Sequence, residues 1–105
     1  MAQVIEEGSE LRLILSPLER IGAMHGSLSA PKSSLVNTFV MDQPWDRKVG
    51  MKGARAPGTG VPGVIMLGTL RGRGFKDFAA VHGKRSAKVF EFEGQEFRRW
   101  IVTLD

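Results

Sequence analysis

The chain has 105 residues, a formal net charge of +4 and no cysteine. Its length suits one domain over residues 1–105, because two separate cores would each be too small to be stable. Without cysteine, a disulfide framework and zinc–thiolate sites are excluded. The acidic N-terminus does not match a secretory signal, and the longest uncharged stretch, 56–70, is interrupted by Pro and Gly. We therefore expect a cytoplasmic protein with no transmembrane segment.

The N-terminal third predicts a hairpin followed by a short helix. Apolar residues alternate over 2–6 and 10–15, as in two strands that each bury one face. Ser16-Pro17-Leu18-Glu19 is typical of a helix start, since Ser can cap, Pro suits the first turn and Glu completes a capping box. A helix near residues 17–24 should then turn one stripe of side chains toward the core, formed by Leu18, Ile21 and either Met24 or His25.

The rest of the chain predicts strands. The run 35–41 has apolar residues on both faces, which is typical of an interior strand, and 64–70 is similar. Glycine-rich turns then separate 75–82, 87–93 and 97–104, a spacing typical of an antiparallel meander. The fold class we expect is mainly β: a bent antiparallel β-sandwich or open barrel with one short helix.

One segment breaks this pattern. Residues 43–63 hold three prolines and five glycines without apolar periodicity, which predicts a long irregular loop of a kind that is often functional. Within it, Gly58–Gly63 matches G-x-G-x-x-G, but the dinucleotide fingerprint needs a strand before it and a helix after it. A strand follows here, so we assign these glycines to turns. Trp45 is either an anchor for a partner or a cover for the core.

No set of residues indicates catalysis. The two histidines, His25 and His82, are far apart in the sequence and near no carboxylate cluster, and no serine lies in a nucleophile elbow. We therefore expect no catalytic residue, no metal site and no cofactor, and hence no enzyme.

Charge is the stronger functional signal. Residues 47–88 hold ten basic residues against one acidic residue, Asp77. Such a segment could bind an acidic protein or an anionic ligand, although a solvated basic face would look the same. The candidate contacts for an anion or partner are Arg47, Lys48, Lys52, Arg55, Arg71, Arg73 and Lys76. An alternative is nucleic-acid binding by a small β-barrel, with Arg71, Arg73 and Lys76 on phosphates and Phe75 stacked on a base.

The order of several loop motifs resembles a protein family. The motifs are Leu15-Ser16-Pro17-Leu18-Glu19-Arg20, Pro44-Trp45, the run from Ala56 to Val64, and Gly72-Arg73-Gly74 with Lys76-Asp77-Phe78. Together they are similar to a group of small actinobacterial proteins that resemble bacterial pleckstrin-homology-like (PH-like) domains. The resemblance implies a non-enzymatic binding or scaffolding module. Such folds are usually closed by a C-terminal helix, for which this sequence leaves no room after its last strand.

Something else must then cover the open end of the β domain. Residues 95–105 carry apolar side chains on both faces, among them Ile101. Either the helix near 17–24 covers the second face or a second copy of the chain does, as an isologous homo-oligomer. If a second copy does, Ile101 lies at the interface.

Overall fold

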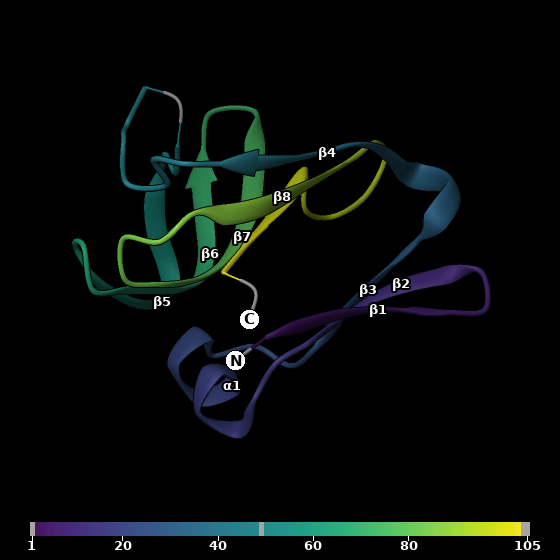
Figure 1. Ribbon diagram of the computed structural model, residues 1–105, viewed down its shortest axis with the longest axis horizontal. Coiled ribbons are helices and arrows are strands. Elements are labelled where there is room, and N and C mark those ends of the chain that lie inside the picture. Colours follow the sequence, from purple (N-terminus) through teal and green to yellow (C-terminus); the bar gives the residue numbers. More distant parts are fainter. Residues whose placement is uncertain (1, 49, 104–105) are drawn as a thin grey trace.

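The computed structural model of the chain describes residues 2–48 and 50–103, apart from the side chains of Arg55 and Ala56. Within these residues the chain forms two β-sheets and one short α-helix, which confirms the predicted mainly β sandwich-like fold (Figure 1). The smaller sheet has the order β1-β2-β3, with bounds β1 (Gln3–Glu7), β2 (Glu10–Ile14) and β3 (Leu28–Pro31). The larger sheet has the order β4-β8-β9-β7-β6-β5, with bounds β4 (Leu35–Met41), β5 (Ala54–Val61), β6 (Ile65–Gly72), β7 (Phe75–His82), β8 (Ala87–Phe92) and β9 (Arg99–Val102).

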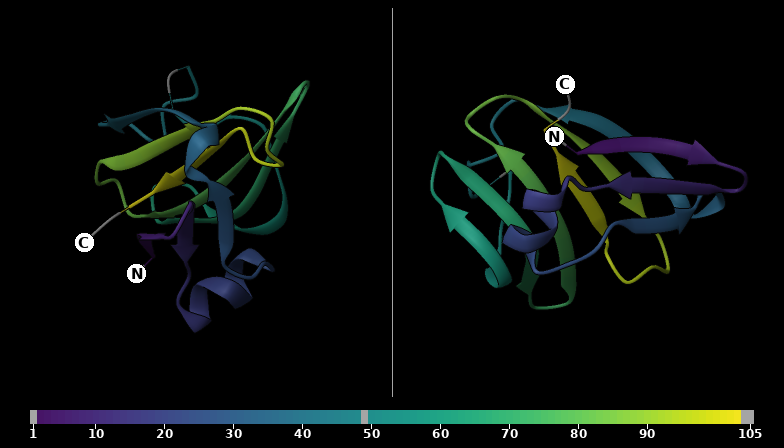
Figure 2. Two further views of the ribbon diagram at one scale, coloured as in Figure 1. Left: turned by 90° about the vertical axis from the view of Figure 1, so that its right-hand side faces the viewer. Right: turned by 90° about the horizontal axis from the view of Figure 1, so that it is seen from below.

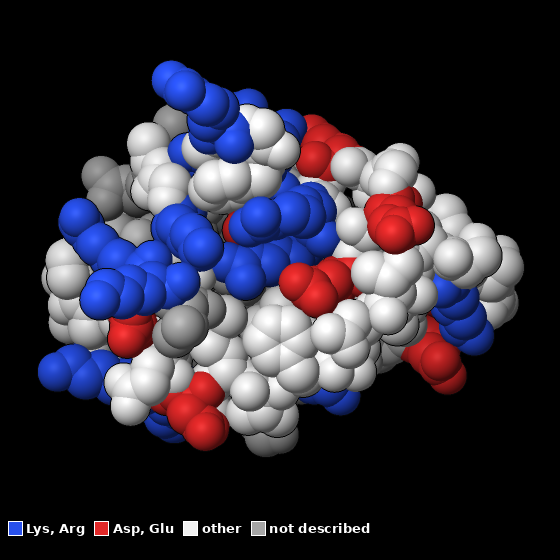
Figure 3. Space-filling model, turned by 90° about the horizontal axis from the view of Figure 1, so that it is seen from above, with Lys and Arg blue, Asp and Glu red and all other residues white. Residues whose placement is uncertain are grey.

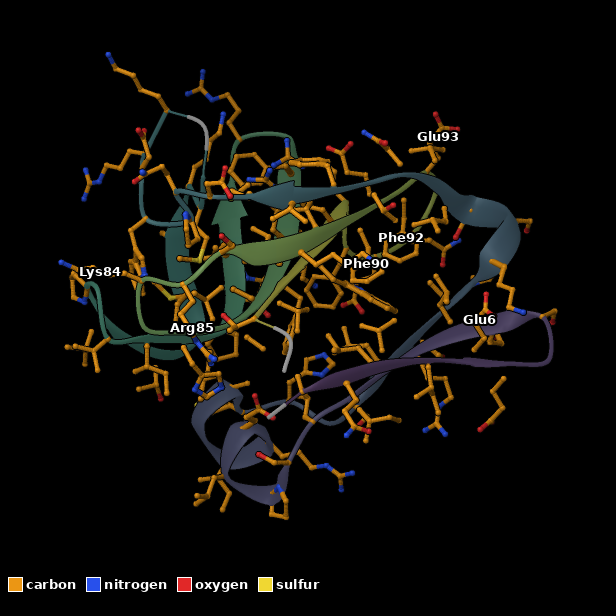
Figure 4. All side chains as sticks on the ribbon, in the orientation of Figure 1. Glu6, Lys84, Arg85, Phe90, Phe92 and Glu93 are labelled. Carbon is orange, nitrogen blue, oxygen red and sulfur yellow. The ribbon has the colours of Figure 1, made fainter. Side chains whose placement is uncertain are left out.

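The main core lies between the two sheets, which pack face to face (Figure 2). From the small sheet it takes the alternating leucines of the predicted hairpin, Leu11 and Leu13. From the large sheet it takes the aromatic residues, and Figure 4 shows Phe90 and Phe92 on the side of β8 that faces the small sheet. Trp100 tilts against both rings, with centroids at 6.2 and 4.6 Å. Every second residue of β2, and Phe90 and Phe92 two positions apart in β8, therefore form the contact between the two sheets.

The helix α1 (Pro17–Ala23) has the predicted capping box. The Glu19 amide donates to the Ser16 hydroxyl at 3.3 Å, and the Ser16 amide donates to the Glu19 carboxylate at 2.9 Å. The predicted apolar stripe is wrong, however: Leu18 is 80% exposed, and Ile21 and Met24 also face solvent. The opposite face of the helix packs inward, because Gly22 lets the helix approach β6 closely. A Cβ at Gly22 would lie 2.7 Å from the Leu67 side chain.

The last strand is inserted rather than added at the edge. We predicted a meander, but β9 lies between β8 and β7, antiparallel to β8 and parallel to β7. The connection after β8 folds back first, since the Phe92 amide donates to the Arg98 carbonyl and the Arg98 amide donates to the Lys76 carbonyl, both at 2.8 Å. This brings the start of β9 beside β7, so the sheet is mixed at this pair.

Strand β4 is an edge strand, not the interior strand that its two-sided apolar pattern predicts. It pairs with β8 alone, and Val36, Phe39 and Val40 are exposed. The register of the strand shifts between Leu35 and Asn37, and its two ends enter different cores. Leu35 packs against the main core, whereas Met41 is buried in a second cluster on the opposite face of the large sheet.

The members of the second cluster show which segment covers that opposite face. It is built from residues of the large sheet together with Met51 and the half-buried Trp45. Residues 42–48 and 50–53, called the covering loop below, therefore lie over this face, at the upper left of Figure 1. The predicted irregular loop at 43–63 is wrong in its second half, because residues 54–61 form β5.

The covers predicted for Ile101 are wrong. Its side chain is fully buried in the second cluster of its own chain, under the covering loop rather than under α1, and it is not available for an interface with a second copy. The two-sided apolarity of β9 therefore has a cause within the chain. Leu104, which we placed in the same strand, lies outside the described residues.

Candidate ligand-binding cavity

The covering loop is held compactly by its own backbone. The Gly50 amide donates to the Asp46 carbonyl at 2.6 Å, and the Met51 amide donates to the Pro44 carbonyl at 2.8 Å. Gly50 is required by close approach, because a Cβ there would lie 2.4 Å from the Pro44 carbonyl oxygen. These bonds bring Met51 and Trp45 against the large sheet.

A buried ion pair ties the loop to the sheet. Asp77 in β7 is fully buried, and its carboxylate accepts hydrogen bonds from Arg99 Nε at 2.8 Å and from Arg98 Nε and Nη2 at 3.0 and 2.8 Å. The Nη2 group of Arg99 donates to the Gly50 carbonyl at 2.9 Å. Because a buried guanidinium needs partners for its donors, this network fixes both the start of β9 and the position of the loop.

Two further contacts join the loop to the strand turns beside it. The Trp45 indole donates to the Gly83 carbonyl at 2.8 Å, which fixes the ring against the β7–β8 turn. The next residue, Lys84, extends to the β5–β6 turn, whereas Arg85 points toward α1 (Figure 4). A Cβ at Gly63 would lie 2.9 Å from Lys84 Cε, so the absence of a side chain at Gly63 makes room for the lysine stem.

These elements enclose a cavity of about 710 Å³ between the covering loop and the β5–β6 hairpin. Its described lining consists of Trp45, Arg47, Met51, Lys52, Gly53, Pro62, Gly63, Met66, Leu70 and Lys84. The apolar members belong to the second cluster or adjoin it, and the three cations are exposed. We call this site the basic-rimmed cavity. Its volume lies in the range typical of small-molecule sites.

The structure brings together only some of the predicted contacts. Arg47 and Lys52 line the basic-rimmed cavity, while Lys48 is exposed in the covering loop outside the lining. The side chain of Arg55 lies outside the described part of the chain. Figure 3 shows Lys and Arg side chains gathered over the half of the molecule that carries the covering loop and the β6–β7 hairpin.

Sequence reasoning missed Lys84 and left Trp45 undecided. Lys84 is 32 positions from Lys52 and was assigned only to a turn. The signal that could have found it is its place after Gly83, in the turn that follows β7, the strand that pairs with β6. Trp45 covers the second cluster, which is one of the two roles weighed for it, and it also lines the cavity.

The other predicted contacts belong to the β6–β7 hairpin, where Phe75 and Lys76 are engaged within the chain. Arg98 lies over the Phe75 ring, 4.4 Å from its centroid. Lys76 donates to Glu96 at 2.6 Å and lies over Phe97. The hydrogen bond from Lys76 holds the pKa of Glu96 below its usual value, against a small opposing effect of burial. Arg71 and Arg73 belong to the same hairpin.

A second pair of titratable groups lies outside the cavity. Glu19 is buried, and its Oε2 accepts from the Ala2 amide at 3.2 Å and lies 2.8 Å from His82 Nε2. Burial raises the pKa of Glu19, but the hydrogen bonds from Ser16 and His82 and the charge of His82 lower it further than burial raises it. The pair links α1 to β7 across 63 positions, a distance over which no spacing motif could reveal it.

Searches for a site of a known kind found little. Among residues 2–48 and 50–103, no group of three or more His, Cys, Asp or Glu side chains is placed to hold a metal ion. No helix in that part of the chain is long and apolar enough to span a bilayer. Neither family models, nor curated proteins, nor solved structures match the sequence.

Proposed function

We propose that the protein is a non-enzymatic binding module that holds an acidic ligand at the basic-rimmed cavity. The observation that carries this proposal is the charge of the lining: Arg47, Lys52 and Lys84 surround the cavity, and its described lining has no acidic residue. Cations around a concave surface attract anions, because the low-dielectric wall concentrates their field. In this proposal the module is of the PH-like kind that the sequence resembles and acts in the bacterial cytoplasm.

The cavity is also the better candidate of the two basic surfaces. At the β6–β7 hairpin, the Phe75 ring that would stack on a base is covered by Arg98, and Lys76 is paired with Glu96. A nucleic-acid ligand would have to displace both contacts. Nucleic-acid binding by Arg71, Arg73 and Lys76 is therefore the second candidate, and it predicts binding at a different place.

Titration of ¹⁵N-labelled protein with inorganic phosphate tests the proposal. We expect amide shifts around Arg47, Lys52 and Lys84, and we expect them to weaken in Lys84→Ala and at rising ionic strength, since exposed charges are screened within about 8 Å at physiological salt. Lys32→Ala is the matched control, because Lys32 is a cation in the turn between the two sheets, remote from the cavity.

Two results would overturn the proposal. Shifts confined to residues 71–76 would favour the nucleic-acid candidate. Equal weakening by Lys32→Ala and Lys84→Ala would mean that the net charge of the protein, not the cavity, attracts the anion.

A further inference from the structure

We infer that the ligand of the basic-rimmed cavity is an amphipathic anion, with an apolar body inside the cavity and an acidic group at its rim. The inference rests on the proposed function for the acidic group and adds the apolar body. It follows from how the lining divides, since apolar side chains and cations occupy different parts of it.

The inner part of the lining is apolar and belongs to the second cluster. Leu70 and Met51 are 2% and 7% exposed, and both pack in that cluster. Met66 and Trp45 pack against it and are half-buried, so each presents part of its side chain to the cavity. A site for phosphate alone would need polar donors at this depth, and these side chains offer almost none.

The cations surround this apolar surface instead of lying within it. Arg47, Lys52 and Lys84 are all exposed, and they come from two segments, the covering loop and the β7–β8 turn. The Lys84 stem passes over Gly63, which places an aliphatic chain along the cavity wall and leaves the ammonium group at the mouth. An anion held there can extend its apolar part inward.

Two methionines suit such a ligand. Met51 and Met66 lie on the covering loop and on β6, and their unbranched thioether side chains can adjust to apolar groups of different shapes. The cavity volume of about 710 Å³ is large enough for a small organic molecule and much larger than a single phosphate needs. The body is therefore an alkyl or aromatic group rather than a second anion.

Fluorescence of Trp45 can test this, because Trp45 lines the cavity whereas the second tryptophan, Trp100, is 2% exposed in the main core. The probes are octyl sulfate, butyl sulfate, inorganic sulfate and octanol, each below any concentration at which it forms micelles. Burial of one methylene raises affinity about fourfold. Because the two chains differ by four methylenes, octyl sulfate should bind roughly 250-fold more tightly than butyl sulfate, and octanol should bind more weakly than octyl sulfate.

Two variants locate the apolar body. Met66→Gln should weaken octyl sulfate at least tenfold and leave inorganic sulfate unchanged. Met24→Gln is the control, since Met24 is 70% exposed at the end of α1 and outside the cavity lining. An unchanged amide spectrum outside the cavity shows that each variant is folded. If Met66→Gln unfolds the protein, transfer of saturation from the octyl protons to the Met66 methyl group in the unaltered protein gives the same location.

The outcomes separate the inference from the proposed function. If all three sulfates bind equally at the rim, the proposed function stands and the apolar body is refuted. If octanol binds as tightly as octyl sulfate, and Lys84→Ala changes neither, the site is purely apolar and both statements fail. If no sulfate perturbs residues of the cavity at all, the proposed function fails first.

Discussion

Asp77→Asn should destabilise the protein severely, because it removes the charge that compensates Arg99 in the interior. Asp77 is fully buried and Arg99 is 6% exposed, so water cannot replace either partner. Breaking a buried pair by altering one member costs about 3–5 kcal/mol. A domain of this size is stable by about 5–15 kcal/mol in total, so the loss is a large part of the free energy of unfolding.

Arg98 provides the internal comparison. Its side chain is 44% exposed although it also bonds Asp77, so its ion pair should contribute about 0–1 kcal/mol. Its position over Phe75 adds about 0.5–1 kcal/mol. Arg98→Ala should therefore cost clearly less than Asp77→Asn or Arg99→Met.

Urea unfolding followed by tryptophan fluorescence measures all of these variants. The double variant Asp77→Leu with Arg99→Met should be more stable than either single variant at these positions, because no buried charge is left unpaired. Two results would refute this expectation. Either the losses in free energy of unfolding at Asp77 and Arg99 add in the double variant, or Arg98→Ala lowers that free energy as much as Arg99→Met does. Either result would mean that water reaches the Asp77–Arg99 pair and that this pair does not hold the covering loop in place.

Three further predictions test other parts of the molecule. The folded-state pKa of Glu19 lies below its ordinary value of 4.5, so its contribution is present above that pH and is lost as pH falls through the folded pKa. Urea midpoints at pH 6 and pH 3 should therefore differ less for Glu19→Gln than for the unaltered protein. Gly50→Ala should cost more than 1 kcal/mol in urea unfolding because its Cβ meets the Pro44 carbonyl, whereas Gly26→Ala, with open space around its Cβ, should stay within about 0.5 kcal/mol. Leu18→Ser should also stay within about 0.5 kcal/mol of the unaltered protein by thermal unfolding, where a buried leucine would cost about 2–5 kcal/mol.

The sequence predicts those parts of the fold that depend on local signals. The capping box at Ser16 and Glu19 and the alternation in β2 are short-range features, and the structure has them. The apolar stripe of α1 failed because helical periodicity identifies an apolar face but not which face packs. The other face packs inward because Gly22 lets the helix approach β6 closely and because the buried Glu19 carboxylate has a partner in His82.

The remaining errors have one cause, which is non-local pairing. The insertion of β9 depends on Asp77 meeting Arg99 across 22 positions, and the second cover of the sheet depends on Met51 and Trp45 in a segment without periodicity. Two of the three cations of the described cavity rim, Arg47 and Lys52, were found through their charge. Lys84 joins that rim only because the β5–β6 and β7–β8 turns lie side by side.

Intermolecular NOE spectroscopy of the protein with octyl sulfate shows directly whether the basic-rimmed cavity holds an amphipathic anion. The account predicts contacts from the alkyl protons to the methyl groups of Met51 and Met66 and to the Trp45 ring, with the sulfate end nearest Lys84. A smaller cavity of about 230 Å³, lined by Leu28, Phe97 and Trp100, provides the competing location on the same molecule. Contacts to those three residues, or an alkyl chain that contacts none of the cavity's side chains, would contradict the account.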